Sequence, residues 1–213
     1  MKSIRRKSAA KVTRRPAADK FDEKRNELAT AALQTLSELG YARTSLREIA
    51  KTSDYSHGVL HYYFADKYEL IMFCVRQYKA VCVKRYDEVV ASATSAVQLK
   101  TGFADAMAGT LVADATMHRL WYDLRTQSMF EASFHADVSE INRSLERMIW
   151  RIVTEYARLA KKPVGVTESF AYAMFDGMFE QALRKQLAGD KDAAKDLAAN
   201  VQRLLAQHVL ATR

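Results

Sequence analysis

Apolar residues recur at helical spacing along most of the chain. The first periodic segment, residues 22–39, places Leu28, Leu36 and Leu39 on the face that a helix would bury. Gly40 follows directly, as expected at the end of a helix. The pattern therefore predicts a first helix that ends near residue 39.

Two short helices and a longer one are predicted next. Thr44 or Ser45 can cap the first short helix, and Ser56 can cap the second. Residues 53–55 separate them as a turn. The predicted ranges are 46–51, 56–64, and a connecting helix from 65 through at least 82.

Helical periodicity continues after a weakly patterned joint at 92–101. The segment 167–187 is apolar on more than one side, which is typical of a helix that packs on its own core and on a second surface. Together with 137–159 it is expected to form a four-helix bundle with a second copy of the chain. Further helices are expected over 103–113 and 118–130, and in a last segment built on Leu197, Val201, Leu204 and Val209.

Composition supports an all-α fold, because only two prolines and seven glycines interrupt 213 residues of which 49% are hydrophobic. Cys74 and Cys82 lie roughly 12 Å apart along one predicted helix, too far to bridge each other. We expect core thiols and a cytoplasmic location. Neither a signal-peptide core nor a run of eighteen apolar residues is present, so secretion and membrane insertion are not expected.

The net charge of +8 indicates a polyanionic partner. A large share of it lies in residues 1–18, which contain no acidic residue and too little apolar surface to fold alone. We expect a basic, disordered arm over 1–20 that contacts DNA. An organellar transit peptide is the alternative, since such peptides are also basic and acid-poor. The basic residues are Lys2, Arg5, Arg6, Lys7, Lys11, Arg14 and Arg15.

Two short helices joined by a tight turn, behind a basic arm, suit a reader of double-stranded DNA. One helix crosses the DNA backbone while the next enters the major groove, about 12 Å wide, with short side chains at its leading end. His57, Gly58 and Val59 occupy that end. The order of elements therefore predicts a helix-turn-helix.

Residues 25–70 resemble the TetR family of bacterial repressors almost continuously. The matching stretches are Leu28-Ala29-Thr30-Ala31-Ala32-Leu33 with Gly40-Tyr41, Thr44 through Ala50, and Ser56 through Leu70. The resemblance implies that Thr44 and Lys67 hold phosphates, that Tyr62 and Tyr63 position the reading helix, and that His57, Gly58, Val59 and His61 face bases. The full expected DNA-binding set is Thr44, Ser45, Arg47, Ser56, His57, Gly58, Val59, His61, Tyr62, Tyr63 and Lys67.

The sequence departs from the family pattern at two positions. Asp54 stands where the family usually has a turn glycine, and aspartate adopts left-handed backbone geometry only at some cost. His61 replaces a residue that is commonly tyrosine, which changes the base-reading set. His57 and His61 also have the spacing of a zinc-binding pair, but no third ligand is evident nearby, so DNA contact is the preferred interpretation.

Aromatic residues gather in the C-terminal part and predict an effector pocket, although such side chains also simply fill cores. Aromatic faces attract apolar groups and cations, so an apolar or cationic effector is expected. His118, Asp123, Glu131 and His135 are either polar anchors or exposed helix positions. The expected pocket residues are Trp121, Tyr122, Phe130, Trp150, Tyr172 and Phe175.

No glycine-rich phosphate loop, metal motif or nucleophile arrangement is recognisable, so no enzyme, cofactor or metal is expected. The expected protein is a homodimeric, ligand-responsive repressor that binds a palindromic operator and is released by a small molecule. A helical enzyme and a nonspecific DNA-compacting protein are the alternatives. The expected domains are the arm over 1–20, the helix-turn-helix over 21–70, and a ligand-binding and dimerisation domain over 71–213 that includes the connecting helix to about 90.

Overall fold

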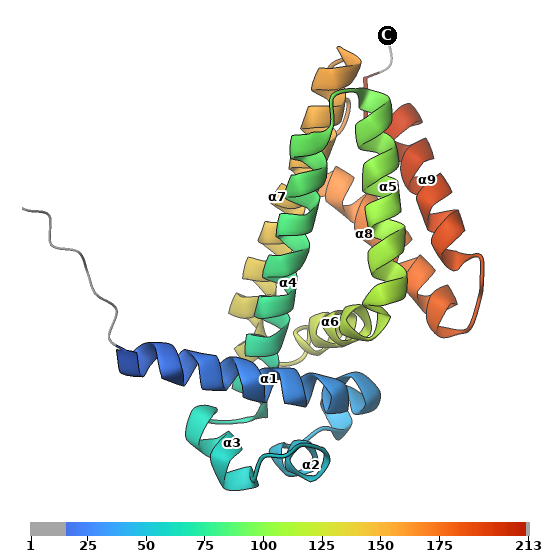
Figure 1. The fold of residues 1–213 in the computed structure, drawn as a ribbon. Coiled ribbons are helices and arrows are strands. Elements are labelled where there is room, and N and C mark those ends of the chain that lie inside the picture. The colour runs from blue at the N-terminus through green and yellow to red at the C-terminus, as the bar shows by residue number, and fades with distance from the viewer. Residues whose placement is uncertain (1–15, 212–213) are drawn as a thin grey trace, which may run out of the picture.

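The computed structural model describes residues 16–211, which are helical apart from short connections (Figure 1). Within this range no strand forms, and the only β-bridge is an isolated antiparallel pair, Val164 with Leu210. The predicted all-α fold is confirmed. The helices are α1 (Pro16–Arg43), α2 (Leu46–Thr52), α3 (His57–Tyr63), α4 (Lys67–Ser92), α5 (Ala96–Ala113), α6 (Ala115–Gln127), α7 (His135–Ala160), α8 (Glu168–Leu187) and α9 (Ala193–Gln207), with a 3-10 turn over Ala132–Phe134.

Helices α1 to α3 form a small unit at one end of the molecule, around side chains such as Leu28, Ile49 and Leu60 that have no exposed surface (Figure 1). Gly40, with φ 73°, breaks the helical geometry of α1 where the sequence predicts a stop. The hydroxyl of Ser45 accepts a hydrogen bond from the Glu48 amide and caps α2. Ser56 caps α3 in the same way.

The remaining helices form a second bundle above α1. Helix α4 rises from α1 beside α7, α5 packs along α9, and α7 packs against α8 (Figure 1). Helix α6 closes the lower end of this bundle and lies against α1. Cys74 and Cys82 are buried free thiols, as expected. No helix between residues 16 and 211 is both long enough and apolar enough to cross a membrane.

Three sequence expectations change. Helix α1 begins at Pro16, so residues 16–20 are helical rather than part of a disordered arm; residues 1–15 lie outside the described residues. The joint expected over 92–101 shrinks to 93–95, because the Ser95 hydroxyl caps α5 by accepting from the Gln98 amide. Apart from glycines, only Lys161 has a positive φ within the described range, so the turn at Asp54 needs no left-handed residue.

Candidate DNA-binding surface and effector cavity

An open groove runs between α2, α3 and the start of α4. Five of the residues expected to bind DNA line it, and the caps at Ser45 and Asp66 hold the helix starts that form its rim. Leu46 and Asp66 line the groove as well, although neither was expected to bind DNA. The residues lining the groove are Ser45, Leu46, Arg47, His57, His61, Asp66 and Lys67.

The two histidines of α3 lie side by side, with ring centroids 4.4 Å apart. Partial desolvation, together with the nearby His61 and Arg47, lowers the pKa of His57. A neutral imidazole carries one donor and one acceptor, which suits contact with base edges. Within residues 16–211 no group of three or more His, Cys, Asp or Glu side chains is placed to hold a metal ion.

Tyr62 and Tyr63 differ in exposure. The Tyr62 side chain is 74% exposed, whereas Tyr63 is half-buried against Phe21 of α1, with ring centroids 4.8 Å apart. Tyr62 is therefore free to reach a DNA backbone. Tyr63 instead fixes α3 against α1.

Two of the expected phosphate ligands already have partners. The Thr44 side chain is buried, and its hydroxyl donates to the Gly40 carbonyl at 2.7 Å, so it stabilises the junction of α1 and α2 and is not presented to a phosphate. Lys67 Nζ donates to the Tyr41 carbonyl at 3.2 Å and lies 4.1 Å from the centre of the Tyr41 ring. Lys67 still lines the groove, but α1 holds its position.

The remaining residues expected to bind DNA, Ser56, Gly58 and Val59, differ in exposure. Gly58 and Ser56 are exposed, and a side chain added at Gly58 would meet nothing closer than the Ser56 hydroxyl at 3.9 Å. Val59 is half-buried against the core. Close approach of DNA at Gly58 is therefore sterically open.

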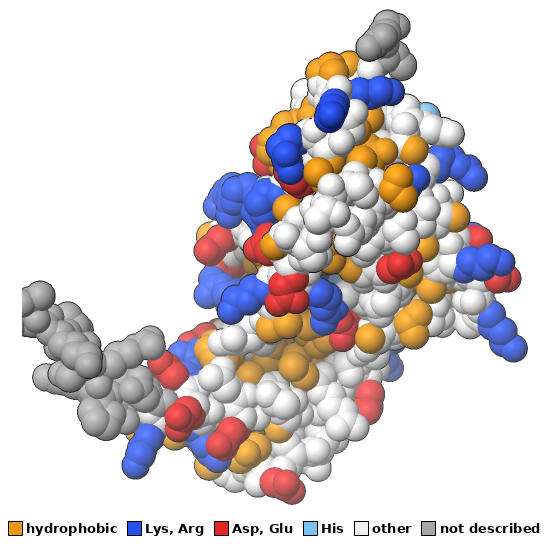
Figure 2. Space-filling view, turned by 45° about the horizontal axis from the view of Figure 1, so that its top comes forward, with side chains coloured by type: hydrophobic (Ala, Val, Ile, Leu, Met, Phe, Trp, Pro, Cys, Tyr) orange, Lys and Arg blue, Asp and Glu red, His pale blue; other side chains and the backbone are white. Residues whose placement is uncertain are grey.

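Positive charge is not concentrated on the helical body. In Figure 2, Lys and Arg side chains are scattered over the visible face and alternate with Asp and Glu. Residues 1–15 contain seven basic and no acidic side chains, so they carry seven of the eight net charges of the chain. Their placement lies outside the described residues.

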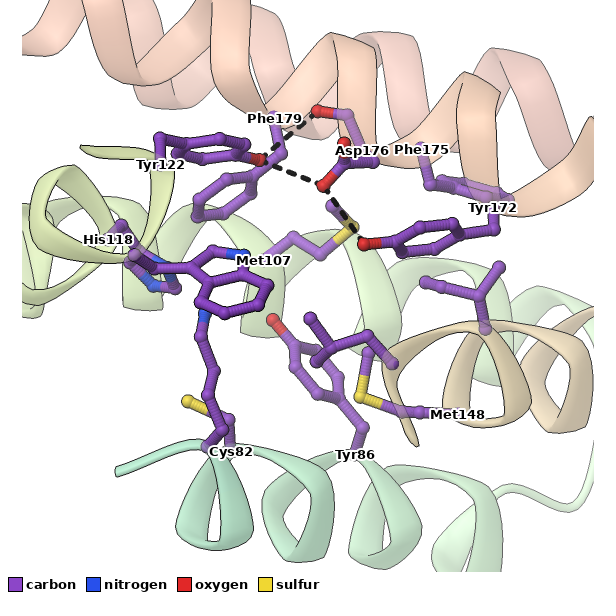
Figure 3. A pocket seen from close by; sticks show the side chains of 14 residues that line it. Cys82, Tyr86, Met107, His118, Tyr122, Met148, Tyr172, Phe175, Asp176 and Phe179 are labelled. Atoms are coloured by element: carbon purple, nitrogen blue, oxygen red, sulfur yellow. Dashed lines mark hydrogen bonds between the residues drawn. The ribbon is translucent and has the colours of Figure 1, made fainter. Parts of the chain in front are cut away.

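A small cavity lies inside the second bundle, where five helices converge (Figure 3). Its volume is about 60 Å³, enough for only a few water molecules. Helix α4 contributes Lys79, Cys82 and Tyr86, and α6 contributes His118, Trp121 and Tyr122. The other lining residues are Met107, Leu145, Met148, Ile149, Tyr172, Phe175, Asp176 and Phe179.

Asp176 is the centre of a polar network on one wall (Figure 3). Its carboxylate accepts two hydrogen bonds from Arg125 Nη1, at 2.9 and 2.7 Å, and one from the Tyr122 hydroxyl, at 3.1 Å. The Tyr172 hydroxyl shares its proton between Asn142 Oδ1, at 3.0 Å, and Asp176 Oδ1, at 3.4 Å. Burial and the nearby Asp176 carboxylate raise the pKa of both tyrosines, so both remain donors. The network joins α6 to α8.

Lys79, Trp121 and His118 form the opposite polar edge. Burial lowers the pKa of Lys79 to about 8, and its ammonium lies 5.2 Å from the centre of the Trp121 ring. Burial, reinforced by the positive charges of Lys79 and Arg85, lowers the pKa of His118 to about 2. His118 is therefore neutral, and its Nε2 shares a hydrogen bond of 3.0 Å with the Tyr78 hydroxyl.

Four of the six residues expected in the pocket line this cavity: Trp121, Tyr122, Tyr172 and Phe175. Phe130 does not, because it lies in the turn after α6 and is 82% exposed. Trp150 does not either, since it follows Ile149 on α7 and projects about 100° away from it. Of the polar candidates, only His118 lines the cavity.

Comparison with known proteins matches the N-terminal helices to a family. Residues 28–72 match the family described as bacterial regulatory proteins, tetR family. No curated protein matches the chain. The family match covers α2 and α3 with parts of α1 and α4.

Several solved structures of regulators share the fold of this chain. The transcriptional regulator FadR from Bacillus subtilis, in complex with stearoyl-CoA, is 18% identical, with a TM-score of 0.72 over 86% of this chain and 98% of that one. A TetR regulator from Haloarcula marismortui is 16% identical, with a TM-score of 0.73 over 90% and 100%. A putative regulator from Saccharomonospora viridis, in complex with choline, is 11% identical, with a TM-score of 0.74 over 90% and 100%.

Specific hydrogen bonds hold α6 against α1 and the start of α4 against α7. The Tyr41 amide, at the kink of α1, donates to Asp123 of α6 at 2.8 Å. The Tyr68 hydroxyl, at the start of α4, donates to the Ser133 carbonyl at 2.9 Å and also contacts Asp137 of α7. Asp123, considered above as a polar anchor for a ligand, instead joins α6 to α1.

Proposed function

We propose that this regulator is a ligand-responsive repressor that binds a palindromic operator as a homodimer and releases it when a small molecule enters the cavity. The observation that carries the proposal is the position of the cavity: two of its walls, α4 and α6, also pack against α1. As a repressor it acts on DNA in the cytoplasm and catalyses no reaction.

The size of the cavity supplies the mechanism. Because about 60 Å³ holds only a few waters, a ligand must push the cavity walls apart. Lys79 is twelve residues beyond Lys67, so displacement at the cavity acts on a rigid helix roughly 18 Å from the groove. A tilt of α4 then changes the separation of the two reading helices from one DNA turn, about 34 Å, and operator affinity falls.

The two ligand-bound structures support the presence of an effector. FadR from Bacillus subtilis was solved with stearoyl-CoA, and the regulator from Saccharomonospora viridis was solved with choline. Two very different ligands therefore occur in proteins of this fold. The chemistry of the effector must therefore come from the cavity of this chain.

The outward face of α8 supports dimerisation. On its inner face Phe175 and Phe179 are buried, whereas Phe170 is 56% exposed. Gly177 is exposed in the middle of the helix, and a side chain there would meet nothing within 4 Å. A glycine costs stability inside a helix and needs a reason, which close approach of a second copy supplies. The exposed or half-buried stripe comprises Phe170, Ala173, Met174, Gly177, Met178 and Gln181.

Gly177→Arg is expected to make the protein monomeric, because a long charged side chain on this stripe separates the two copies. Sedimentation equilibrium measures the mass in solution. Gly109→Arg is the matched control, since Gly109 is also an exposed glycine in open space within a helix. The control stays dimeric and keeps its operator affinity. A Gly177→Arg protein that remains dimeric would place the interface elsewhere.

Tyr62→Ala is expected to weaken binding to operator and random DNA alike by roughly tenfold, because an exposed tyrosine beside the reading helix contacts the backbone. His57→Ala instead costs about 1–3 kcal/mol on the operator alone, as expected for a base contact. Gel-shift titration on DNA upstream of the gene, against random duplex of the same length, measures both effects.

Val97→Ala is the control for these variants. Its side chain is 68% exposed at the start of α5, at the end of the molecule away from α3 (Figure 1). Equal affinity of the wild type for upstream and random DNA would refute the repressor and favour a nonspecific DNA-binding protein.

A further inference from the structure

The ammonium group of Lys79 is buried in the cavity wall without an anionic partner. The side chain is 7% exposed, and within the described residues no hydrogen bond or ion pair involves its Nζ. Its contacts are the aromatic rings of Tyr78 and Trp121, 5.5 and 5.2 Å from the amine. Buried charges in proteins are ordinarily paired with an opposite charge. The Lys79 ammonium has no such partner between residues 16 and 211, and an anionic ligand can supply one.

The carboxylate that lines the cavity does not meet this need. Asp176 already accepts from Arg125 and Tyr122, and the Arg125 guanidinium balances its charge. His118 is neutral. In the described part of the chain no carboxylate therefore pairs directly with Lys79, and its positive charge disfavours the cationic effector suggested by the aromatic content of the sequence.

A second polar group beside Lys79 also lacks a partner. Trp121 is 1% exposed, and its indole Nε1 is buried without a hydrogen-bond acceptor. An indole N–H can only donate, as can an ammonium group. One cavity edge thus presents two donors, one of them a buried N–H without an acceptor, and the complement of two donors is an oxygen with free lone pairs.

Building on the proposed repressor, we propose that the effector is a compact organic acid whose carboxylate binds Lys79 Nζ and Trp121 Nε1, with its hydrocarbon part against Phe175 and Phe179. The flexible thioether side chains of Met107 and Met148 move to make room. Because Lys79 lies on α4 and Trp121 on α6, one carboxylate engages both helices that lead to α1.

The test compares matched probes on the full chain at pH 7. Phenylacetate, phenylacetamide and phenethylammonium share one ring and differ in charge, and octanoate, octanamide and octylammonium repeat the comparison with a flexible chain. Isothermal calorimetry is expected to show at least one carboxylate binding about tenfold or more tighter than its ammonium counterpart. Lys79→Met then weakens carboxylate binding about 10- to 100-fold and amide binding much less.

Lys84→Met is the matched control, because it removes the same charge from the exposed surface of the same helix. Trp121→Phe keeps an aromatic ring but removes the N–H donor, and is expected to weaken carboxylate binding several-fold. If Lys79→Met does not fold, the ranking of probes on the wild type and on Trp121→Phe decides.

Three results would overturn the proposal: tighter binding of the ammonium probes, equal carboxylate affinity for wild type and Lys79→Met, or no binding by any probe. Gel shifts on the same samples, without any probe, measure operator binding alone. They therefore test the proposed repressor independently of the proposed effector. Failure of the wild type to bind its operator rejects the repressor, whereas the calorimetric ranking still reports on the cavity.

Discussion

Replacing Asp176 with alanine is expected to lower the free energy of unfolding by about 3 kcal/mol, because removal of one partner leaves a partly buried charge uncompensated. The Arg125 and Asp176 side chains are only 28% and 14% exposed, and the hydroxyls of Tyr122 and Tyr172 lose the carboxylate oxygen that they share. At roughly 2–4 °C per kcal/mol for a chain of this size, the melting temperature should fall by about 6–12 °C.

An exposed ion pair in the same molecule provides the comparison. Arg151 and Asp87 are 44% and 50% exposed, so Asp87→Ala should cost less than about 1 kcal/mol. Combining Arg125→Met with Asp176→Leu should recover much of the lost stability, since an apolar pair replaces the buried charges. Equal melting temperatures for Asp176→Ala and Asp87→Ala would show that solvent screens the network.

The helix-turn-helix could be predicted from sequence because its signals are local. Ser45 and Ser56 cap the helices that they were expected to cap, and Gly40 breaks α1 at the expected position. The role of Thr44 could not be predicted in this way. Its hydroxyl faces the Gly40 carbonyl because α1 kinks there. The local sequence predicts that the helix is interrupted at Gly40, but it does not predict the direction of the kink.

The cavity was only half predictable, because five helices of the fold must pack before it exists. Aromatic content found Trp121, Tyr122, Tyr172 and Phe175 but also suggested Phe130, which a short turn directs outward. The hydrophobicity of a side chain indicates that it can be buried. It does not predict the direction of the turn that decides whether the side chain faces the core or solvent.

Lys79 was missed although the sequence contains a signal for it. Val75, Cys82 and Tyr86 form a buried stripe on α4, and Lys79 occupies the position four residues after Val75 and three before Cys82. A lysine inside an apolar stripe indicates either a solvated stem or a buried charge with a task.

The last prediction concerns acid. His118 is neutral in the folded chain down to about pH 2, whereas an unfolded histidine takes up a proton near pH 6.5. Below pH 6.5 the unfolded state therefore binds a proton that the folded state does not, and stability falls by about 1.4 kcal/mol per pH unit. Between pH 6 and pH 4 this group alone should remove about 2.5 kcal/mol.

His118→Gln isolates this contribution, because glutamine can still hydrogen-bond the Tyr78 hydroxyl but does not titrate. Urea unfolding is measured at each pH. At pH 8 the variant should be less stable than wild type, because glutamine cannot make the ring contact of His118 with Phe179, whose centroids are 4.5 Å apart. The difference in stability should shrink as the pH falls and then reverse, because only in the wild type does protonation of His118 stabilise the unfolded state. His208→Gln, at an exposed histidine, should keep the full acid sensitivity. Parallel stability curves for wild type and His118→Gln would mean that His118 takes up its proton without unfolding, and that the cavity admits a second positive charge beside Lys79.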